Sequence, residues 1–160
     1  MEVFITDDRI IILEIIVVGM HRSGTSLVCS ILNKMGVYFG DTALLMRDQS
    51  NEKGYFERFQ INEVQDYILR FNGYSWVKIS GYDAGCLGKV SQQIFDNGMR
   101  SFFNECRAEA IWGVKDPRIC LTFPLWRKHL EHPVCVFAFR NPCHVAKSLN
   151  RRDGFSLEYG

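Results

Sequence analysis

The feature that most constrains the fold is an apolar run that passes through a glycine turn into an amphipathic segment. Residues 10–18 are rich in β-branched side chains and almost continuously apolar, which is typical of a strand buried on both faces. Residues 19–24 form a tight turn with a glycine at each end, and residues 25–35 predict a helix that Gly36 ends. The apolar face of this helix is expected to hold Leu27, Val28, Ile31, Leu32 and Met35. A buried strand followed by a turn and a helix predicts an α/β fold.

The rest of the sequence continues this alternation. Further strands are expected at residues 37–39, 110–114 and 133–139, and further helices at residues 58–71, 90–108, 121–130 and from Asn141 onward. Asn141 is a good N-cap residue, and Pro142 suits the first helical position. Residues 72–88 carry four glycines and predict a long loop, of a length that is usually functional or mobile. Together these elements predict a three-layer sandwich with a mostly parallel sheet.

Length and composition are those of one ordinary globular domain. The chain has 160 residues, of which 47% are hydrophobic, and a formal net charge of +1. A protein that binds nucleic acid usually carries a clear basic excess, so nucleic acid is not an expected partner. Any anion chemistry must therefore lie in a local site.

The cysteines and the N-terminus indicate a cytoplasmic protein. The six cysteines show no CxxC pair and no metal-finger spacing, and four lie in apolar runs, so we expect mostly buried, reduced thiols. The first eight residues are acidic where a signal peptide would be basic. The run 10–18 is short and broken by Glu14, so no membrane span is expected.

The strongest functional motif is Gly19-Met20-His21-Arg22-Ser23-Gly24-Thr25-Ser26. Two glycines five apart let successive N–H groups point inward, and the following helix adds its positive N-terminal end, which is typical of a phosphate site. The spacing is that of a P-loop, so the expected fold is P-loop nucleotide-hydrolase-like. Thr25 stands where nucleotide triphosphatases have a lysine, and Arg22 supplies the cation instead.

Two further motifs follow predicted strands. Arg140 ends the strand 133–139, and Ser148 lies about two turns into the next helix, so one anion could touch both. Alternatively, Arg140 pairs with a carboxylate. Lys115, in Val114-Lys115-Asp116-Pro117, can point into the crevice above the loop; alternatively, it forms a surface pair with Asp116.

A fourth motif, Asn51-Glu52-Lys53-Gly54-Tyr55-Phe56-Glu57, places an acid between an aromatic pair and a helix. Glu57 suits a general base with a tuned pKa. It equally suits a cap for the helix that starts near Arg58.

Together these segments resemble the PAPS-dependent sulfotransferase family, from about Ile11 to Gly160 and in the family's order. The loop resembles the one that holds the 5′-phosphosulfate of 3′-phosphoadenosine-5′-phosphosulfate (PAPS), through Arg22, Ser23, Gly24, Thr25 and Ser26. Arg140 and Ser148 resemble the pair that binds its 3′-phosphate, and Lys115 resembles a lysine that reaches the sulfuryl group. The fourth motif and Arg151-Arg152-Asp153-Gly154-Phe155-Ser156 are similar to bacterial sulfotransferase-like proteins.

The resemblance implies sulfuryl transfer by in-line displacement. An acceptor hydroxyl or amine attacks sulfur, and adenosine 3′,5′-bisphosphate leaves. Arg22 and the loop amides stabilise the leaving phosphate oxygen, and Lys115 stabilises the sulfuryl oxygens. Glu57 is the expected base, with Asp116 and Glu52 as alternatives. No metal is required, and the acceptor is a small molecule, carbohydrate, lipid or peptide.

Two other functions stay open. Sulfotransferase domains are usually longer, so residues 1–160 are expected to form a single domain that lacks the C-terminal part of the family domain. Such a domain could bind a phosphorylated nucleotide without transferring sulfate. A P-loop kinase or triphosphatase is the other alternative, although the loop lysine and an acidic strand end for Mg²⁺ are missing.

Overall fold

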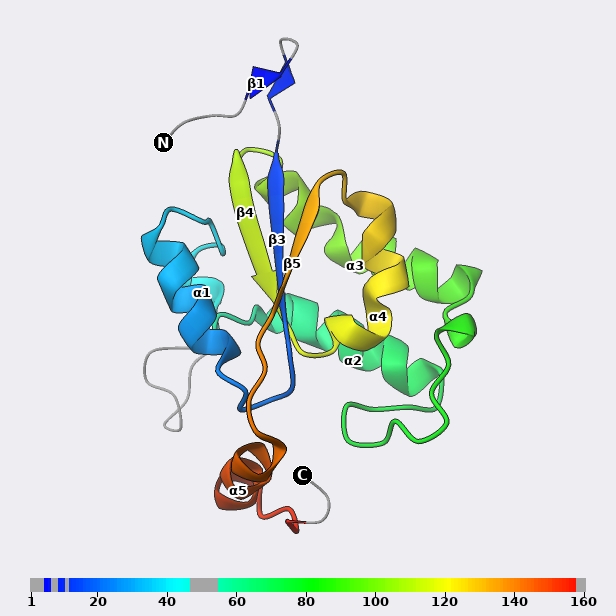
Figure 1. Ribbon diagram of the computed structural model, residues 1–160. Coiled ribbons are helices and arrows are strands. Elements are labelled where there is room, and N and C mark those ends of the chain that lie inside the picture. Colours follow the sequence, from blue (N-terminus) through cyan, green and yellow to red (C-terminus); the bar gives the residue numbers. More distant parts are fainter. Residues whose placement is uncertain (1–4, 7–8, 11, 47–54, 158–160) are drawn as a thin grey trace.

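A three-stranded parallel sheet with helices on both faces forms the body of the computed structural model, which describes residues 5–6, 9–10, 12–46 and 55–157 (Figure 1). The strands lie in the order β4-β3-β5, with bounds Leu13–Val18 for β3, Ile111–Lys115 for β4 and Pro133–Phe137 for β5. Both neighbours run parallel to β3. The chain is therefore mixed α/β, as the alternating pattern predicts.

The helices follow the predicted order closely. They are α1 Thr25–Lys34, α2 Phe59–Phe71, α3 Lys89–Cys106, α4 Ile119–Trp126 and α5 Pro142–Asp153. Short 3₁₀ helices span Thr42–Leu44, Ala84–Cys86 and Arg127–His129, and a small antiparallel pair joins β1 Ile5–Thr6 to β2 Arg9–Ile10. The strand expected at 37–39 is a single parallel bridge from Tyr38 to Trp112 at the edge of β4. Asn141 caps α5 as predicted, since its Oδ1 accepts a 2.9 Å hydrogen bond from the Cys143 amide.

Alternate residues of β3 supply both halves of the core. Ile16 and Val18 belong to the larger cluster, which includes Phe95 of α3 and Trp126 of α4. Ile15 and Val17 join Cys29 of α1, Val37 and Phe39 in a smaller cluster on the other face. This alternation places α1 on one side of the sheet and α2, α3 and α4 on the other (Figure 1).

The predicted apolar face of α1 is wrong in part. Leu27, Ile31 and Met35 are exposed, with 67%, 52% and 73% of their side-chain surface accessible, whereas Val28 and Leu32 are half-buried. The buried face of α1 is centred instead on Thr25 and Cys29, because the sheet beneath it is narrow.

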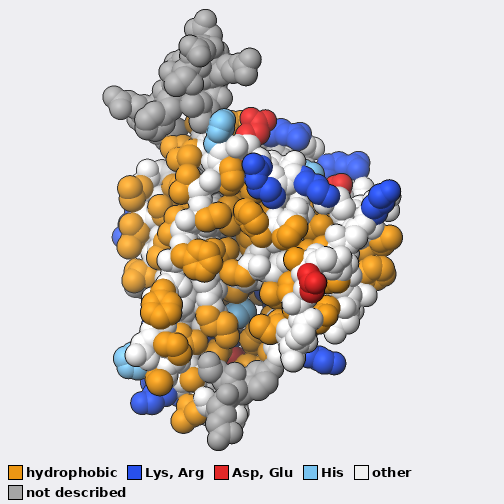
Figure 2. All heavy atoms as spheres, turned by 45° about the vertical axis from the view of Figure 1, so that its right-hand side comes forward, with side chains coloured by type: hydrophobic (Ala, Val, Ile, Leu, Met, Phe, Trp, Pro, Cys, Tyr) orange, Lys and Arg blue, Asp and Glu red, His pale blue; other side chains and the backbone are white. Residues whose placement is uncertain are grey.

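The expectation of mostly buried cysteines is also corrected. All six cysteines are free, but only Cys29 and Cys106 are buried, while Cys120, Cys135 and Cys143 are exposed. Cys135 lies on β5, of which three of the five residues are exposed, and Phe137 on the same strand is 74% exposed. Hydrophobic side chains predominate on the face of the molecule seen in Figure 2. Among the described residues, no helix is both long enough and apolar enough to cross a membrane.

The carboxyl ends of the three strands meet at one edge of the sheet, where the functional motifs lie. β3 leads into α1 on one face, whereas β4 leads into α4 on the opposite face. Chains that diverge in this way leave a crevice between the two strand ends, and ligands of open α/β sheets bind in such crevices. The loop 19–24 and the C-terminus of β4 flank this crevice, and α5 lies beyond the same edge (Figure 1).

Candidate anion-binding site

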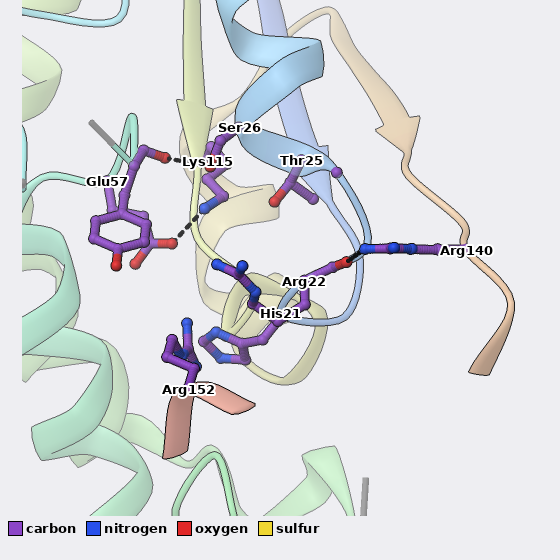
Figure 3. A pocket seen from close by; sticks show the side chains of 10 residues that line it. His21, Arg22, Thr25, Ser26, Glu57, Lys115, Arg140 and Arg152 are labelled. Atoms are coloured by element: carbon purple, nitrogen blue, oxygen red, sulfur yellow. Dashed lines mark hydrogen bonds and ion pairs between the residues drawn. The ribbon is translucent and has the colours of Figure 1, made fainter. Parts of the chain in front are cut away.

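A cavity of about 240 Å³ lies at this edge, between the loop 19–24, the end of β4 and the segment that precedes α2 (Figure 3). Ten of the described residues line it: His21, Arg22, Gly24, Thr25, Ser26, Tyr55, Glu57, Lys115, Arg140 and Arg152. They come from five separate stretches of the sequence, so the fold, not local sequence, assembles the cavity.

The loop that forms one wall holds an unusual backbone conformation. Arg22 has a φ of 68° and Gly24 a φ of 100°, both in the left-handed region. Phe56 has a φ of 55° and adjoins Glu57 of the cavity, and Arg22 and Phe56 are the non-glycine residues with positive φ in the described part of the chain. Strained backbone of this kind clusters at functional sites. Gly24 is the N-cap of α1 and offers no side-chain cap, so the first-turn amides can serve a bound anion.

Arg22 and Arg140 connect the loop to α5. The Arg22 Nε donates a 2.9 Å hydrogen bond to the Ser148 Oγ, and the Arg140 Nη1 donates a 3.1 Å hydrogen bond to the Arg22 carbonyl oxygen. The two motifs thought to hold the two ends of a nucleotide are therefore in direct contact. Ser148 contacts Arg22 through this hydrogen bond and is not among the residues that line the cavity.

Lys115 and Glu57 form a buried ion pair on the opposite wall. The Lys115 Nζ donates to the Glu57 Oε1, and both side chains are less than one-tenth exposed. The Glu57 Oε2 also accepts a 3.4 Å hydrogen bond from the Asn62 Nδ2. The candidate base thus lies beside the candidate sulfuryl-binding lysine (Figure 3).

The cavity is cationic. Among the described residues, Arg22, Lys115, Arg140 and Arg152 line it, and Glu57 is the one carboxylate beside them. His21 adds no charge near neutral pH, because burial, together with the charges of Arg118 and Lys115, lowers its pKa to about 3. A lining with this excess of positive charge suits an anion such as a phosphate or sulfate group.

The structure brings together most of the residues singled out in the sequence. Seven of the predicted site residues line the cavity: Arg22, Gly24, Thr25, Ser26, Glu57, Lys115 and Arg140. Ser23 does not; its hydroxyl is buried and has no hydrogen-bond partner among the described residues. Asp116 is also outside the cavity, because its buried carboxylate accepts hydrogen bonds from the Arg118 amide and guanidinium. Glu52 lies outside the described residues.

Three cavity residues were not singled out from the sequence: His21, Tyr55 and Arg152. Arg152 follows Ser148 by four residues on α5, so the helical period could have placed it on the same face. All three lie inside quoted motifs, but no spacing rule distinguishes His21 and Tyr55 from their neighbours.

No family model matches this chain, and no curated protein and no solved structure shows a significant similarity to it.

We expect Gly19→Ala to destabilise the protein by about 2–4 kcal/mol, because a Cβ there meets backbone that cannot move freely. The added carbon would lie 2.4 Å from the Ala138 carbonyl oxygen and 2.9 Å from the Ser23 Oγ, at a φ of +151°. Gly73→Ala is the matched control: its φ is +84°, but the space around it is open. Urea unfolding should show a loss of about 1 kcal/mol for the control. Equal losses in the two variants would contradict the close approach of the loop to residue 138.

His21 should make the folded state sensitive to acid. Its folded pKa of about 3 lies below the ordinary value of 6.5, so the unfolded chain binds the proton first as the pH falls. The contribution of neutral, buried His21 to the free energy of unfolding is therefore fully present above pH 6.5. It is lost as the pH falls from 6.5 to 3. Relative to His21→Gln, the wild type should lose about 3 kcal/mol of unfolding free energy between pH 7 and pH 4. His144→Gln, at an exposed position of α5, should keep the wild-type pH profile; parallel profiles for wild type and H21Q would refute the assignment.

Proposed function

We propose that this protein transfers a sulfuryl group from PAPS to an acceptor hydroxyl, on a P-loop-like fold. The observation that carries the proposal is the convergence of four separate motifs on one cationic cavity at the carboxyl edge of a parallel sheet. A chance set of surface charges would not be expected to meet at the place where α/β proteins bind nucleotides.

The donor would be bound by two adjoining anion sites. The loop amides, Arg22, Thr25 and Ser26 would hold the 5′-phosphosulfate at the N-terminus of α1. Arg140 and Ser148 would hold the 3′-phosphate. The hydrogen bonds from Arg22 to Ser148 and from Arg140 to the Arg22 carbonyl support this division, because they fix the two sites relative to each other.

The transfer step would use the Lys115–Glu57 pair. The acceptor oxygen forms a bond to sulfur while the bond between sulfur and the bridging phosphate oxygen breaks, and that oxygen leaves with the electron pair. Arg22 and the loop amides stabilise the charge on the leaving oxygen, and Lys115 stabilises the charge on the sulfuryl oxygens. Glu57 takes the acceptor proton, and its position within hydrogen-bond distance of Lys115 keeps base and cation at the same reacting centre. The products are a sulfate ester and adenosine 3′,5′-bisphosphate.

The direct test is product formation by the wild-type chain. Incubation with PAPS and a panel of phenols, alcohols, sugars and peptides should release adenosine 3′,5′-bisphosphate together with a sulfate ester, in equal amounts, as measured by chromatography. Parallel reactions contain Mg-ATP in place of PAPS. Hydrolysis or transfer from Mg-ATP, with no ester formed from PAPS, would contradict the proposal and favour a kinase or triphosphatase.

A further inference from the structure

A second cavity, of about 450 Å³, adjoins the loop 19–24 at Met20. Three segments that are distant in the sequence line it: the loop 19–24 through Met20, the loop 72–88 through residues 76–80, and α5 with the segment that follows it through Leu149 and Phe155. Of its eight lining residues, six are apolar and two, Lys78 and Ser80, are polar. Its described lining is mainly apolar and has one charged side chain, Lys78, so this cavity differs in kind from the cationic one.

The two cavities are direct neighbours. Met20 lines the apolar cavity, and the next residue, His21, lines the cationic one. The His21 ring also contacts the Trp76 ring, with 4.6 Å between their centroids, and Trp76 packs in turn against Phe155 at 5.9 Å. In α5, Leu149 of the apolar cavity follows Ser148, which accepts the hydrogen bond from Arg22. A molecule in the apolar cavity would thus have one end near His21, which also lines the cationic cavity.

We propose that this cavity binds the acceptor, and that the acceptor is a compact apolar alcohol or phenol whose hydroxyl faces the cationic cavity. The inference rests on the proposed sulfuryl transfer and narrows its acceptor class. A volume of about 450 Å³ is within the range of small-molecule sites. A sugar carries several hydroxyl groups, each of which loses its water on burial and needs a new partner. Two polar side chains cannot supply those partners, whereas Trp76, Ile79 and Leu149 suit a ring or a short hydrocarbon.

The same cavity could instead receive the adenine ring of the donor, and the experiment separates the two occupants. The Michaelis constant (KM) is measured for para-cresol at saturating PAPS, and kcat/KM is compared for para-cresol, cyclohexanol and glucose. Calorimetry separately gives the dissociation constant (Kd) of adenosine 3′,5′-bisphosphate. Trp76→Ala removes the largest wall of the cavity. Ile79→Gln changes a side chain that is 49% exposed, so it should fold normally, and Val90→Gln is its control at a 51% exposed position of α3.

We expect kcat/KM for glucose to be at least tenfold below that for para-cresol. Trp76→Ala should raise the KM for para-cresol at least tenfold and Ile79→Gln at least threefold, with the Kd of adenosine 3′,5′-bisphosphate within twofold of wild type. Val90→Gln should change neither constant. Equal use of glucose would overturn the acceptor class.

Two other results would overturn the inference differently. If the variants weaken adenosine 3′,5′-bisphosphate and leave the KM for para-cresol unchanged, the cavity holds the base of the donor, and the proposed transfer stands. If adenosine 3′,5′-bisphosphate does not bind the wild-type chain at all, the proposed transfer fails and the acceptor assignment fails with it.

Discussion

Replacing Lys115 with methionine is expected to lower sulfuryl transfer from PAPS by about 10²–10³-fold, the usual effect of removing one group that stabilises transition-state charge. The same change should destabilise the fold by about 3–5 kcal/mol, because it leaves the Glu57 carboxylate buried without its partner. Loss of stability alone could imitate loss of function. The double variant Glu57→Gln, Lys115→Met separates the two effects, since a neutral pair of similar size leaves no buried charge.

The double variant should regain most of the lost stability and none of the activity. Urea unfolding measures the first quantity, and release of adenosine 3′,5′-bisphosphate from PAPS measures the second. Lys34→Met, at an exposed position in the last turn of α1, is the matched control and should resemble the wild type in both assays. A folded Lys115→Met protein with wild-type turnover would remove Lys115 from the mechanism.

The second large effect concerns donor binding. Arg22→Ala and Arg140→Ala should each weaken the binding of adenosine 3′,5′-bisphosphate by about 10–100-fold, because a hydrogen bond to a charged group contributes about 1.5–3 kcal/mol. The two variants should differ in which phosphate they affect. Arg140→Ala should change the affinity for AMP far less than that for the bisphosphate, because AMP lacks the 3′-phosphate. Arg22→Ala should weaken both ligands, because Arg22 lines the loop and also holds Ser148.

Calorimetric titration of each variant with the two nucleotides measures this pattern. Arg151→Ala removes an exposed cation from the same helix as Ser148 and should retain wild-type affinities. Unchanged affinity in both Arg22→Ala and Arg140→Ala would contradict the division into two anion sites.

The sequence was a good guide wherever local chemistry decides the structure. The apolar run 10–18 contains β3, the glycine spacing gives the loop, and the Asn141-Pro142 pair starts α5. These features depend on a few neighbouring residues, so a single sequence carries them. Arg140 and Lys115 each follow or end a predicted parallel strand, and the carboxyl ends of parallel strands meet at one edge of a sheet. The sequence therefore placed both residues at the same edge.

The sequence was a poor guide wherever burial depends on distant elements. Leu27 and Ile31 fit a buried helical face by their spacing, yet they are exposed, because α1 packs on the sheet through the side that carries Val28, Cys29 and Leu32. Cys135 also lies in an apolar run, yet its side chain is exposed, as are most residues of β5. The buried Lys115–Glu57 pair was equally hidden, since 58 residues separate its members and only the packing of the fold joins them.

The most direct test of the central claim is calorimetric titration of the wild-type chain with adenosine 3′,5′-bisphosphate, AMP and Mg-ATP. We predict that adenosine 3′,5′-bisphosphate binds most tightly, and that removal of the 3′-phosphate weakens binding by at least tenfold. A preference for Mg-ATP, or equal affinity for AMP and the bisphosphate, would contradict the claim that the loop and the Arg140–Ser148 pair together form a site for PAPS.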